Sequence, residues 1–299
     1  MSKYVGVLSC LSIFLLIIVG CNQKDELLKE NLTGELILST PVSSLQKDNK
    51  GLAIFKPSLK KYEIMLNDQY LSSPTLNRKK DKVLARSTTK IVEYDMKNKT
   101  LNVLYIHKDN TIDNISYIPT QDSISFTAYE NGRENIYGFN KNSGSNNILI
   151  KDIYGSYSWS KDGRLILFGR RSKAENGKYK YSVNMYNINM GKEETLFEGY
   201  APQYSNNNQY IAYKEANASN IDNILVIREI TTAKEWIYKS NAIYTYRFSP
   251  DDNYIAIEQQ SRKFASKDYE IIVWDFKSSK KDVLIETITR GYNTGFDWK

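Results

Sequence analysis

The stretch YSWSKDGRLILF at residues 157–168 decides the fold, because it recurs in degenerate form along most of the chain. It reads as a strand that ends on an aromatic residue, a polar turn and a second strand. Two copies match it position for position from the aromatic residue onwards, YSNNNQYIAY at 204–213 and FSPDDNYIAI at 248–257. Two weaker copies of the same ten-residue length stand at 76–85 and 117–126.

The copies recur at a nearly constant spacing. Their anchor residues lie 41, 42, 45 and 44 residues apart, in the order Leu76, Tyr117, Trp159, Tyr204 and Phe248. A period of this length is typical of one four-stranded β-propeller blade. Each later unit reads as strand, short turn, strand, variable loop, strand, turn and strand, so we predict an all-β chain. The equivalent aromatic positions are expected to pack between blades.

The two ends of the repeat region complete one another. The first unit contains only three strand patterns, at residues 35–39, 51–55 and 62–66. Residues 295–299 (GFDWK) repeat the aromatic opening of the unit. We therefore predict that the N- and C-terminal strands share one blade, which closes a six-bladed β-propeller without open sheet edges. Trp298 is then expected to be buried between blades.

The N-terminus has the features of an export signal. Lys3 precedes an uncharged apolar run at residues 5–19, which is short for a membrane-spanning helix. Residues 18–21 (IVGC) resemble the bacterial lipobox, in which small residues precede an acylated cysteine. We predict three segments: a lipoprotein signal peptide at 1–20, a lipidated polar tether at 21–33 and the propeller at 34–299.

Cys21 is thus the expected lipidation site, where diacylglycerol, and with it fatty acids such as palmitate, would be attached. Two acyl chains anchor a protein stably where one chain does not. The expected location is extracytoplasmic, on the bacterial cell membrane. An ordinary signal peptide and an uncleaved anchor are the alternatives.

Composition agrees with an exported single domain. The 299 residues are 41% apolar, enough for a large core, and the two cysteines are Cys10 in the apolar run and Cys21. Removal of residues 1–20 takes away one lysine and no acid, so the net charge falls from +7 to +6. This charge favours anionic lipid headgroups or acidic wall polymers, or serves only solubility. We expect a monomer with no nucleic-acid partner.

Three motifs together resemble the TolB-type propeller repeat. They are the turn WSKDG at 159–163, the strand YIAY at 210–213 and the strand IIVWD at 271–275. The resemblance covers residues 34–299 and implies the propeller fold. TolB itself pairs its propeller with an N-terminal α/β domain, whereas a short tether precedes the blades here. Its partner contacts are therefore not transferred to this chain.

Long loops between the second and third strands are where we expect a partner to bind, since loops on a rigid scaffold tend to carry function. They lie at residues 170–180, 215–222 and 259–268 in the fourth, fifth and sixth units. Their basic and aromatic residues predict a rim that suits an acidic partner or polyanion; solvated loops without function are the alternative. The rim consists of Arg171, Lys173, Lys178, Tyr179, Arg262, Lys263 and Phe264.

Enzymatic residues are scarce. His107 is the only histidine, and the sequence has no Gly-x-Ser-x-Gly nucleophile motif. One histidine and no free cysteine in the mature domain do not make a zinc site. We therefore expect no catalytic residue, no cofactor and no metal.

The predicted function is a membrane-anchored, non-enzymatic module that binds a protein or acidic polymer at the cell envelope. Two alternatives remain open. One is a glycan or small-ligand binder that uses the central channel. The other is a polysaccharide-acting enzyme that uses tyrosine, arginine and acidic side chains.

Overall fold

A computed structural model describes residues 32–39, 51–59, 61–67, 70–107, 111–215, 224–240, 242–261, 269–288 and 295–298. Strands dominate these residues, beside one short 3₁₀ helix, η1 (Pro57–Leu59). Across the described ranges, no helix is both long and apolar enough to cross a membrane.

The strands form six four-stranded antiparallel sheets, each of which is one blade, as the repeat predicts. Taken from the centre outwards, the first three blades consist of β24 (Phe296–Trp298), β1 (Leu36–Ser39), β2 (Gly51–Lys56) and β3 (Lys61–Asn67); β4 (Ser72–Leu76), β5 (Lys82–Arg86), β6 (Lys90–Asp95) and β7 (Thr100–Ile106); and β8 (Ile112–Tyr117), β9 (Ser123–Glu130), β10 (Arg133–Asn140) and β11 (Asn146–Ile153).

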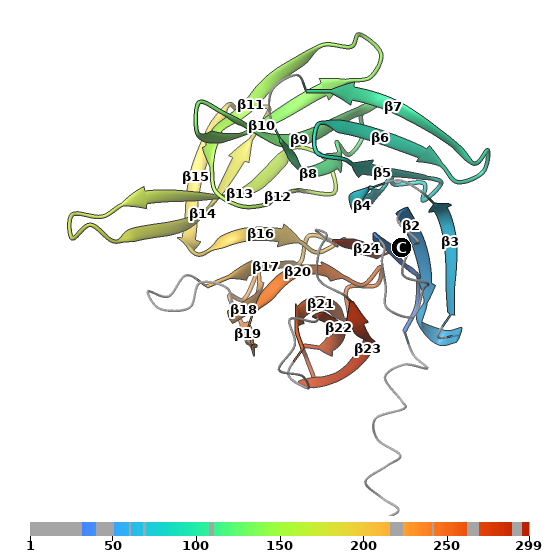
Figure 1. Cartoon of the computed structure of the whole chain (residues 1–299). Coiled ribbons are helices and arrows are strands. Elements are labelled where there is room, and N and C mark those ends of the chain that lie inside the picture. The colour runs from blue at the N-terminus through green and yellow to red at the C-terminus, as the bar shows by residue number, and fades with distance from the viewer. Residues whose placement is uncertain are drawn as a thin grey trace, which may run out of the picture.

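The other three blades follow the same order, and each consists of four consecutive strands. They consist of β12 (Tyr157–Trp159), β13 (Leu165–Lys173), β14 (Tyr179–Asn187) and β15 (Lys192–Glu198); β16 (Tyr200–Tyr204), β17 (Tyr210–Lys214), β18 (Ile224–Glu229) and β19 (Glu235–Lys239); and β20 (Ile243–Phe248), β21 (Ile255–Gln260), β22 (Tyr269–Asp275) and β23 (Lys280–Ile288). Figure 1 shows the six blades around a centre formed by β4, β8, β12, β16, β20 and β24.

The ring closes where the sequence predicts, between β24 and β1. These strands pair antiparallel, with Trp298 opposite Leu36 and Phe296 opposite Leu38. Trp298 is only 7% exposed, and it packs with residues of the first blade and with Val273 of the sixth blade. Its indole Nε1 donates to the carbonyl of Thr33 at 3.1 Å. A residue near the end of the chain is thus buried between two blades.

The serine of the repeat stabilises the turn between the first and second strands of a blade. The Ser160 hydroxyl accepts a hydrogen bond from the backbone N–H of Leu165 at 3.0 Å. Ser249 accepts in the same way from Tyr254 at 2.9 Å, and Ser205 does so in the blade between them. These hydroxyls are buried, so each one satisfies a backbone donor that water does not reach.

Turn residues also connect neighbouring blades. The carboxylate of Asp252 accepts from the backbone N–H groups of Asn206 and Asn207 at 2.8 and 2.7 Å. Gly163 has a φ of +69°, and a Cβ there would lie 2.4 Å from the carbonyl oxygen of Pro119 in the third blade. Only glycine fits both the left-handed backbone and this close approach.

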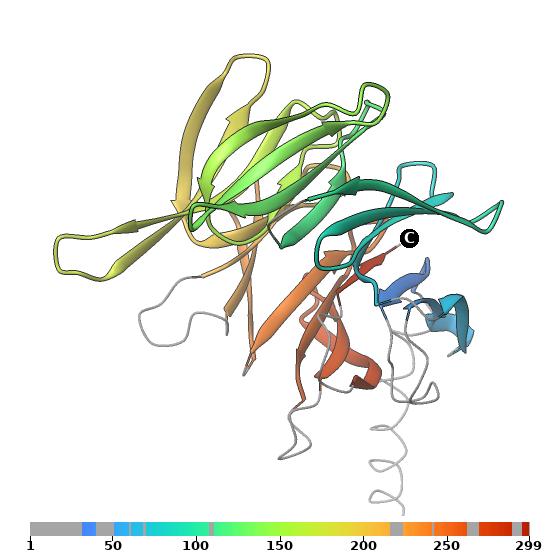
Figure 2. The same cartoon turned by 45° about the horizontal axis from the view of Figure 1, so that its top comes forward.

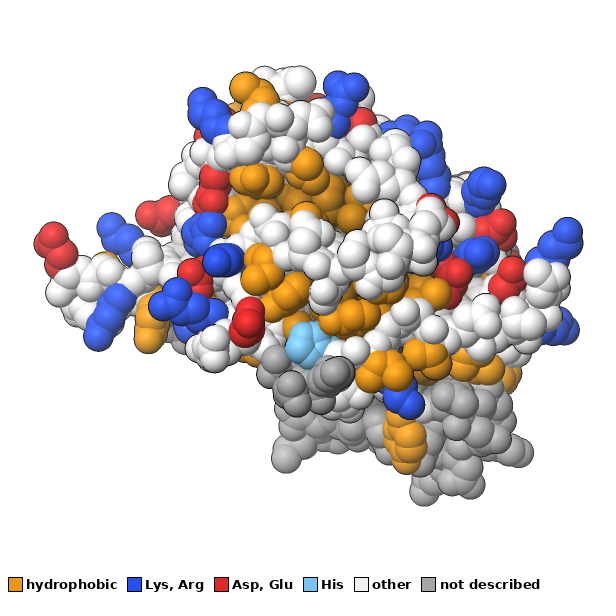
Figure 3. Space-filling view, turned by 90° about the horizontal axis from the view of Figure 1, so that it is seen from above, with side chains coloured by type: hydrophobic (Ala, Val, Ile, Leu, Met, Phe, Trp, Pro, Cys, Tyr) orange, Lys and Arg blue, Asp and Glu red, His pale blue; other side chains and the backbone are white. Residues whose placement is uncertain are grey.

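The strand connections lie on two opposite faces of the propeller. We call the face formed by the first-to-second and third-to-fourth strand connections the turn face, and the opposite one the loop face. On the loop face, the β13–β14 hairpin extends beyond the body of the ring (Figures 1 and 2). Figure 3 shows the molecule from above, where apolar side chains gather between charged ones. The outer strands β7 and β11 carry exposed large apolar residues, among them Val103, Ile106 and Ile148.

Candidate functional site

The innermost strands surround a central channel with a cavity of about 1000 Å³. The walls come from residues of these strands, such as Thr75, Ser116 and Gln203, and the cavity opens among the turns of the turn face. Polar side chains and tyrosines such as Tyr244 give it a mixed lining. A cavity of this size at the centre of a rigid ring is large enough for a small ligand.

The mouth of the channel on the turn face is basic. Arg78, Lys79 and Lys80 lie side by side in the β4–β5 turn, and all three are exposed. None of them has a carboxylate within ion-pair distance among the residues that the structure describes. Lys161 in the β12–β13 turn adds a further exposed cation to the lining.

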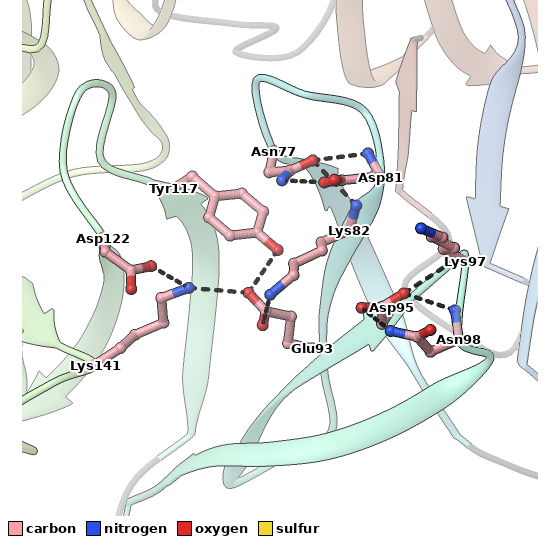
Figure 4. Close-up of polar contacts among 10 residues, drawn as sticks. All are labelled: Asn77, Asp81, Lys82, Glu93, Asp95, Lys97, Asn98, Tyr117, Asp122 and Lys141. Carbon is pink, nitrogen blue, oxygen red and sulfur yellow. Dashed lines mark hydrogen bonds and ion pairs between the residues drawn. The ribbon is translucent and has the colours of Figure 1, made fainter.

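Two other cations at this mouth are paired with the buried carboxylate of Glu93 (Figure 4). The Glu93 carboxylate lies 3.3 Å from Lys82 Nζ and 3.2 Å from Lys141 Nζ. Tyr117 donates its hydroxyl to Glu93 at 3.0 Å, and Asp122 lies 2.6 Å from Lys141 Nζ. Burial, and then the charge of Glu93, hold the pKa of Tyr117 above its usual range. This network links the second blade to the third. The charges of Lys82 and Lys141 are therefore already paired with carboxylates.

Two buried carboxyls occupy interfaces between blades near the loop face. Burial raises the pKa of Glu134 to about 7, although contacts with Thr127 and with the backbone N–H of Gly155 in the next blade oppose the shift. Burial likewise raises the pKa of Glu258 to about 7 against the N–H of Gly295. Both carboxyls therefore take up a proton more readily than exposed glutamates.

On the loop face, Arg171 is held between two aromatic rings. Its guanidinium carbon lies 4.8 Å from the ring centre of Tyr154 and 4.7 Å from that of Tyr179. Tyr154 is supported in turn by Tyr181, at 4.9 Å between ring centres. We call this arrangement of Arg171 between Tyr154 and Tyr179 the arginine clamp. It fixes a planar donor group at the base of an extended hairpin.

The neighbouring Arg170 differs from Arg171 because it is paired with a carboxylate. Its Nε and Nη2 donate to Glu193 Oε1 and Oε2, each at 2.6 Å, and its Nη1 donates to the carbonyl of Lys151. Arg171 has no such carboxylate within the described part of the chain, and it is exposed. Its donors are therefore available to a carboxylate or phosphate from outside.

The structure places four of the predicted rim residues together. Arg171 and Lys173 lie on β13, Tyr179 begins β14, and Lys178 lies in the turn between them. The segment 170–180 is thus a paired hairpin rather than the loop expected from sequence, because Lys173 pairs with Tyr179 across it. The remaining predicted site residues, Cys21, Arg262, Lys263 and Phe264, lie outside the described residues.

His107 follows β7 as expected. Its ring contacts Tyr105 and Tyr137 edge-on, at 6.1 and 6.2 Å between ring centres. Sequence reasoning missed two features that the structure shows: Tyr154 as one side of the clamp, and the basic Arg78–Lys80 turn at the channel mouth. The run of three basic residues in one turn was the signal available for the second feature.

Comparison with known proteins identifies the fold. No family model and no curated protein matches the sequence. TolB from Acinetobacter baumannii superposes with a TM-score of 0.73 at 14% identity, over 90% of this chain and 67% of that one. A putative TolB from Agrobacterium tumefaciens gives 0.64 at 10% identity, over 89% and 98% of the two chains.

A structure of the nidogen/laminin complex gives a TM-score of 0.63 at 8% identity, over 89% of this chain and 98% of that one. At these identities the similarity concerns the fold alone. The chain is therefore a six-bladed β-propeller of the TolB-like kind, as the repeat motifs suggest.

The two buried glutamates should make stability depend on pH. Because their folded pKa of about 7 exceeds the ordinary value of about 4.3, the folded state binds protons that the unfolded state has released. Their contribution is complete below about pH 4.3 and is lost as the pH rises through about 7. The melting temperature should fall between pH 5 and pH 8, and the double variant Glu134→Gln/Glu258→Gln should flatten this slope.

The control is Glu194→Gln, which replaces an exposed glutamate on β15 and should keep the wild-type slope. Each raised carboxyl contributes at most about 3 kcal/mol across the window. Equal slopes in the wild type and the double variant would show that the two carboxyls do not hold protons as described.

Proposed function

We propose that this protein is a lipid-anchored, non-enzymatic module that binds a protein partner at the cell envelope through the β13–β14 hairpin. The arginine clamp is the observation that carries this proposal. Tyrosine and arginine are the residues most enriched at binding hot spots. A guanidinium held between two rings loses little conformational freedom when it binds, so the clamp suits the carboxylate of an acidic partner.

The proposed location rests on the sequence. The apolar run at residues 5–19 and the lipobox-like residues before Cys21 support export and lipidation. We infer that the mature protein begins at Cys21 and that residues 34–299 act as the binding domain.

The channel supports a second candidate function. Its cavity of about 1000 Å³ and its mixed lining of tyrosines and polar groups are suited to a glycan or another small ligand. A glycan array run beside the partner search separates the two functions: a specific sugar would favour the channel, and a specific protein would favour the hairpin.

The test of the hairpin is a quantitative capture from crosslinked envelopes with the wild type and two variants. Arg171→Ala removes the clamped cation, and we expect it to weaken capture of a specific partner by about thirtyfold, the range of a hot-spot residue. Arg171→Lys should also weaken it, because a lysine neither stacks as a plane nor donates bidentately.

The matched control is Lys180→Ala, which removes one exposed positive charge from the same hairpin. We expect it to change capture only slightly, since isolated exposed charges contribute little. If Arg171→Ala and Lys180→Ala bind the partner as well as the wild type, the hairpin is not the binding site.

Lipidation is tested by Cys21→Ser in the full chain, with metabolic labelling by a fatty acid. We expect loss of the label and release from the membrane fraction, because the substitution removes the acceptor of two acyl chains. Cys10→Ser is the control and should keep both properties. A Cys21→Ser protein that remains labelled and membrane-bound would refute the lipoprotein assignment.

A further inference from the structure

The chain enters the propeller on the turn face. Leu36 at the start of β1 lies opposite Trp298, and the preceding Thr33 accepts a hydrogen bond from the indole of Trp298. Leu32 is 5% exposed and packs in the same cluster. Residues 1–31, and Cys21 with them, are therefore joined to the domain at this face. The eleven residues from Cys21 to Leu32 span at most about 40 Å, so an anchor at Cys21 keeps the domain close to the membrane.

Among the connections that the structure describes, charge is distributed unequally between the two faces. Among the described turn-face connections, ten residues are basic and five are acidic. The described loop-face connections contain one basic and two acidic residues, which are Lys178, Glu175 and Glu215. The basic residues of the turn face are Arg78, Lys79, Lys80, Lys97, Lys99, Lys141, Lys161, Arg164, Lys234 and Lys277.

The acids of the turn face are occupied by the turns themselves. Asp162 accepts the Ser160 hydroxyl at 2.6 Å, and Asp251 accepts the Ser249 hydroxyl at 2.6 Å. Asp252 bonds to the adjacent blade, as described above. Because basic residues outnumber acidic ones two to one in the described turn-face connections, the field at this face is positive. The exposed lysines and arginines are spread over the second, fourth, fifth and sixth blades rather than gathered into one pocket.

Apolar side chains stand at the tips of three turns on the same face. Leu59, Met190 and Ile230 are 59%, 71% and 46% exposed, and they belong to the third-to-fourth strand connections of the first, fourth and fifth blades. Isolated apolar tips among dispersed cations are typical of a surface that lies in the headgroup region of a membrane.

We propose that the turn face lies on the membrane, with its lysines and arginines against anionic lipid phosphates and with Leu59, Met190 and Ile230 inserted between headgroups. A lipid surface fits better than an acidic protein, because the cations and the apolar tips are dispersed around a ring as wide as the domain. The inference rests on attachment through the N-terminal segment, and it is independent of what the hairpin binds.

The test uses the full chain on vesicles of phosphatidylcholine, with or without phosphatidylglycerol, that carry an acceptor dye on the headgroups. A donor dye is attached through a bio-orthogonal residue at Asn142 of the turn face or at Ser172 of the hairpin; both positions are exposed. Energy transfer from position 142 should rise when phosphatidylglycerol is present and fall again at high salt. Transfer from position 172 should stay low in both membranes.

Two variants and a control assign the effect. Each basic residue near an anionic surface is worth about fivefold in binding, so Arg78→Glu/Lys79→Glu/Lys80→Glu should shift the orientation equilibrium by more than about a hundredfold. Leu59→Ser/Met190→Ser/Ile230→Ser should lower transfer in both lipids. The control Lys173→Glu/Lys178→Glu/Lys180→Glu changes the net charge by the same amount on the hairpin and should leave transfer from position 142 intact.

Attachment to phosphatidylcholine vesicles measures the N-terminal anchor, whereas the added transfer in phosphatidylglycerol measures contact of the turn face with lipid. The experiment can therefore refute the anchor and the turn-face contact independently. Equal transfer from position 142 in both lipids would overturn the proposal. So would a turn-face variant that loses a crosslink to an acidic envelope protein while its transfer to vesicles is unchanged.

Discussion

The pairing of β24 with β1 is the constraint on which the rest of the structure depends. Three residues at the end of the chain complete the innermost position of the first blade, so all six blades of the ring have four strands. Phe296 and Trp298 are both buried there, and truncation of a buried aromatic residue typically costs about 3–5 kcal/mol. That is a large part of the roughly 5–15 kcal/mol that stabilises a domain.

Closure also determines where the chain leaves the ring. Because β24 and β1 are antiparallel, Trp298 and Leu36 lie together on the turn face, beside the basic β4–β5 turn. The hairpin with the arginine clamp begins on the opposite face. If the turn face lies on lipid, the clamp points away from the membrane, where an envelope protein can reach it. The two proposals thus assign anchoring and partner binding to opposite ends of the same strands.

The fold follows from local patterns that the sequence displays directly. The aromatic anchors, the Ser160-type turns and the three-strand first unit each reflect contacts between residues close in sequence or at equivalent repeat positions, so blade count and closure were predictable. The clamp was not, because Tyr154 lies in the β11–β12 connection and Arg171 on β13, and only the packing of the connection against the strand brings them together. Nor does the sequence show that Asp252 bonds to Asn206, which depends on how two blades pack.

Amide hydrogen exchange of β24 in the intact protein tests closure most directly. If residues 296–298 complete the first blade, their backbone amides should exchange as slowly as those of β1, through global unfolding, although chain ends ordinarily fray. Exchange of β24 at the rate of the exposed turns, with β1 and the other innermost strands still protected, would show that the ring closes in another way.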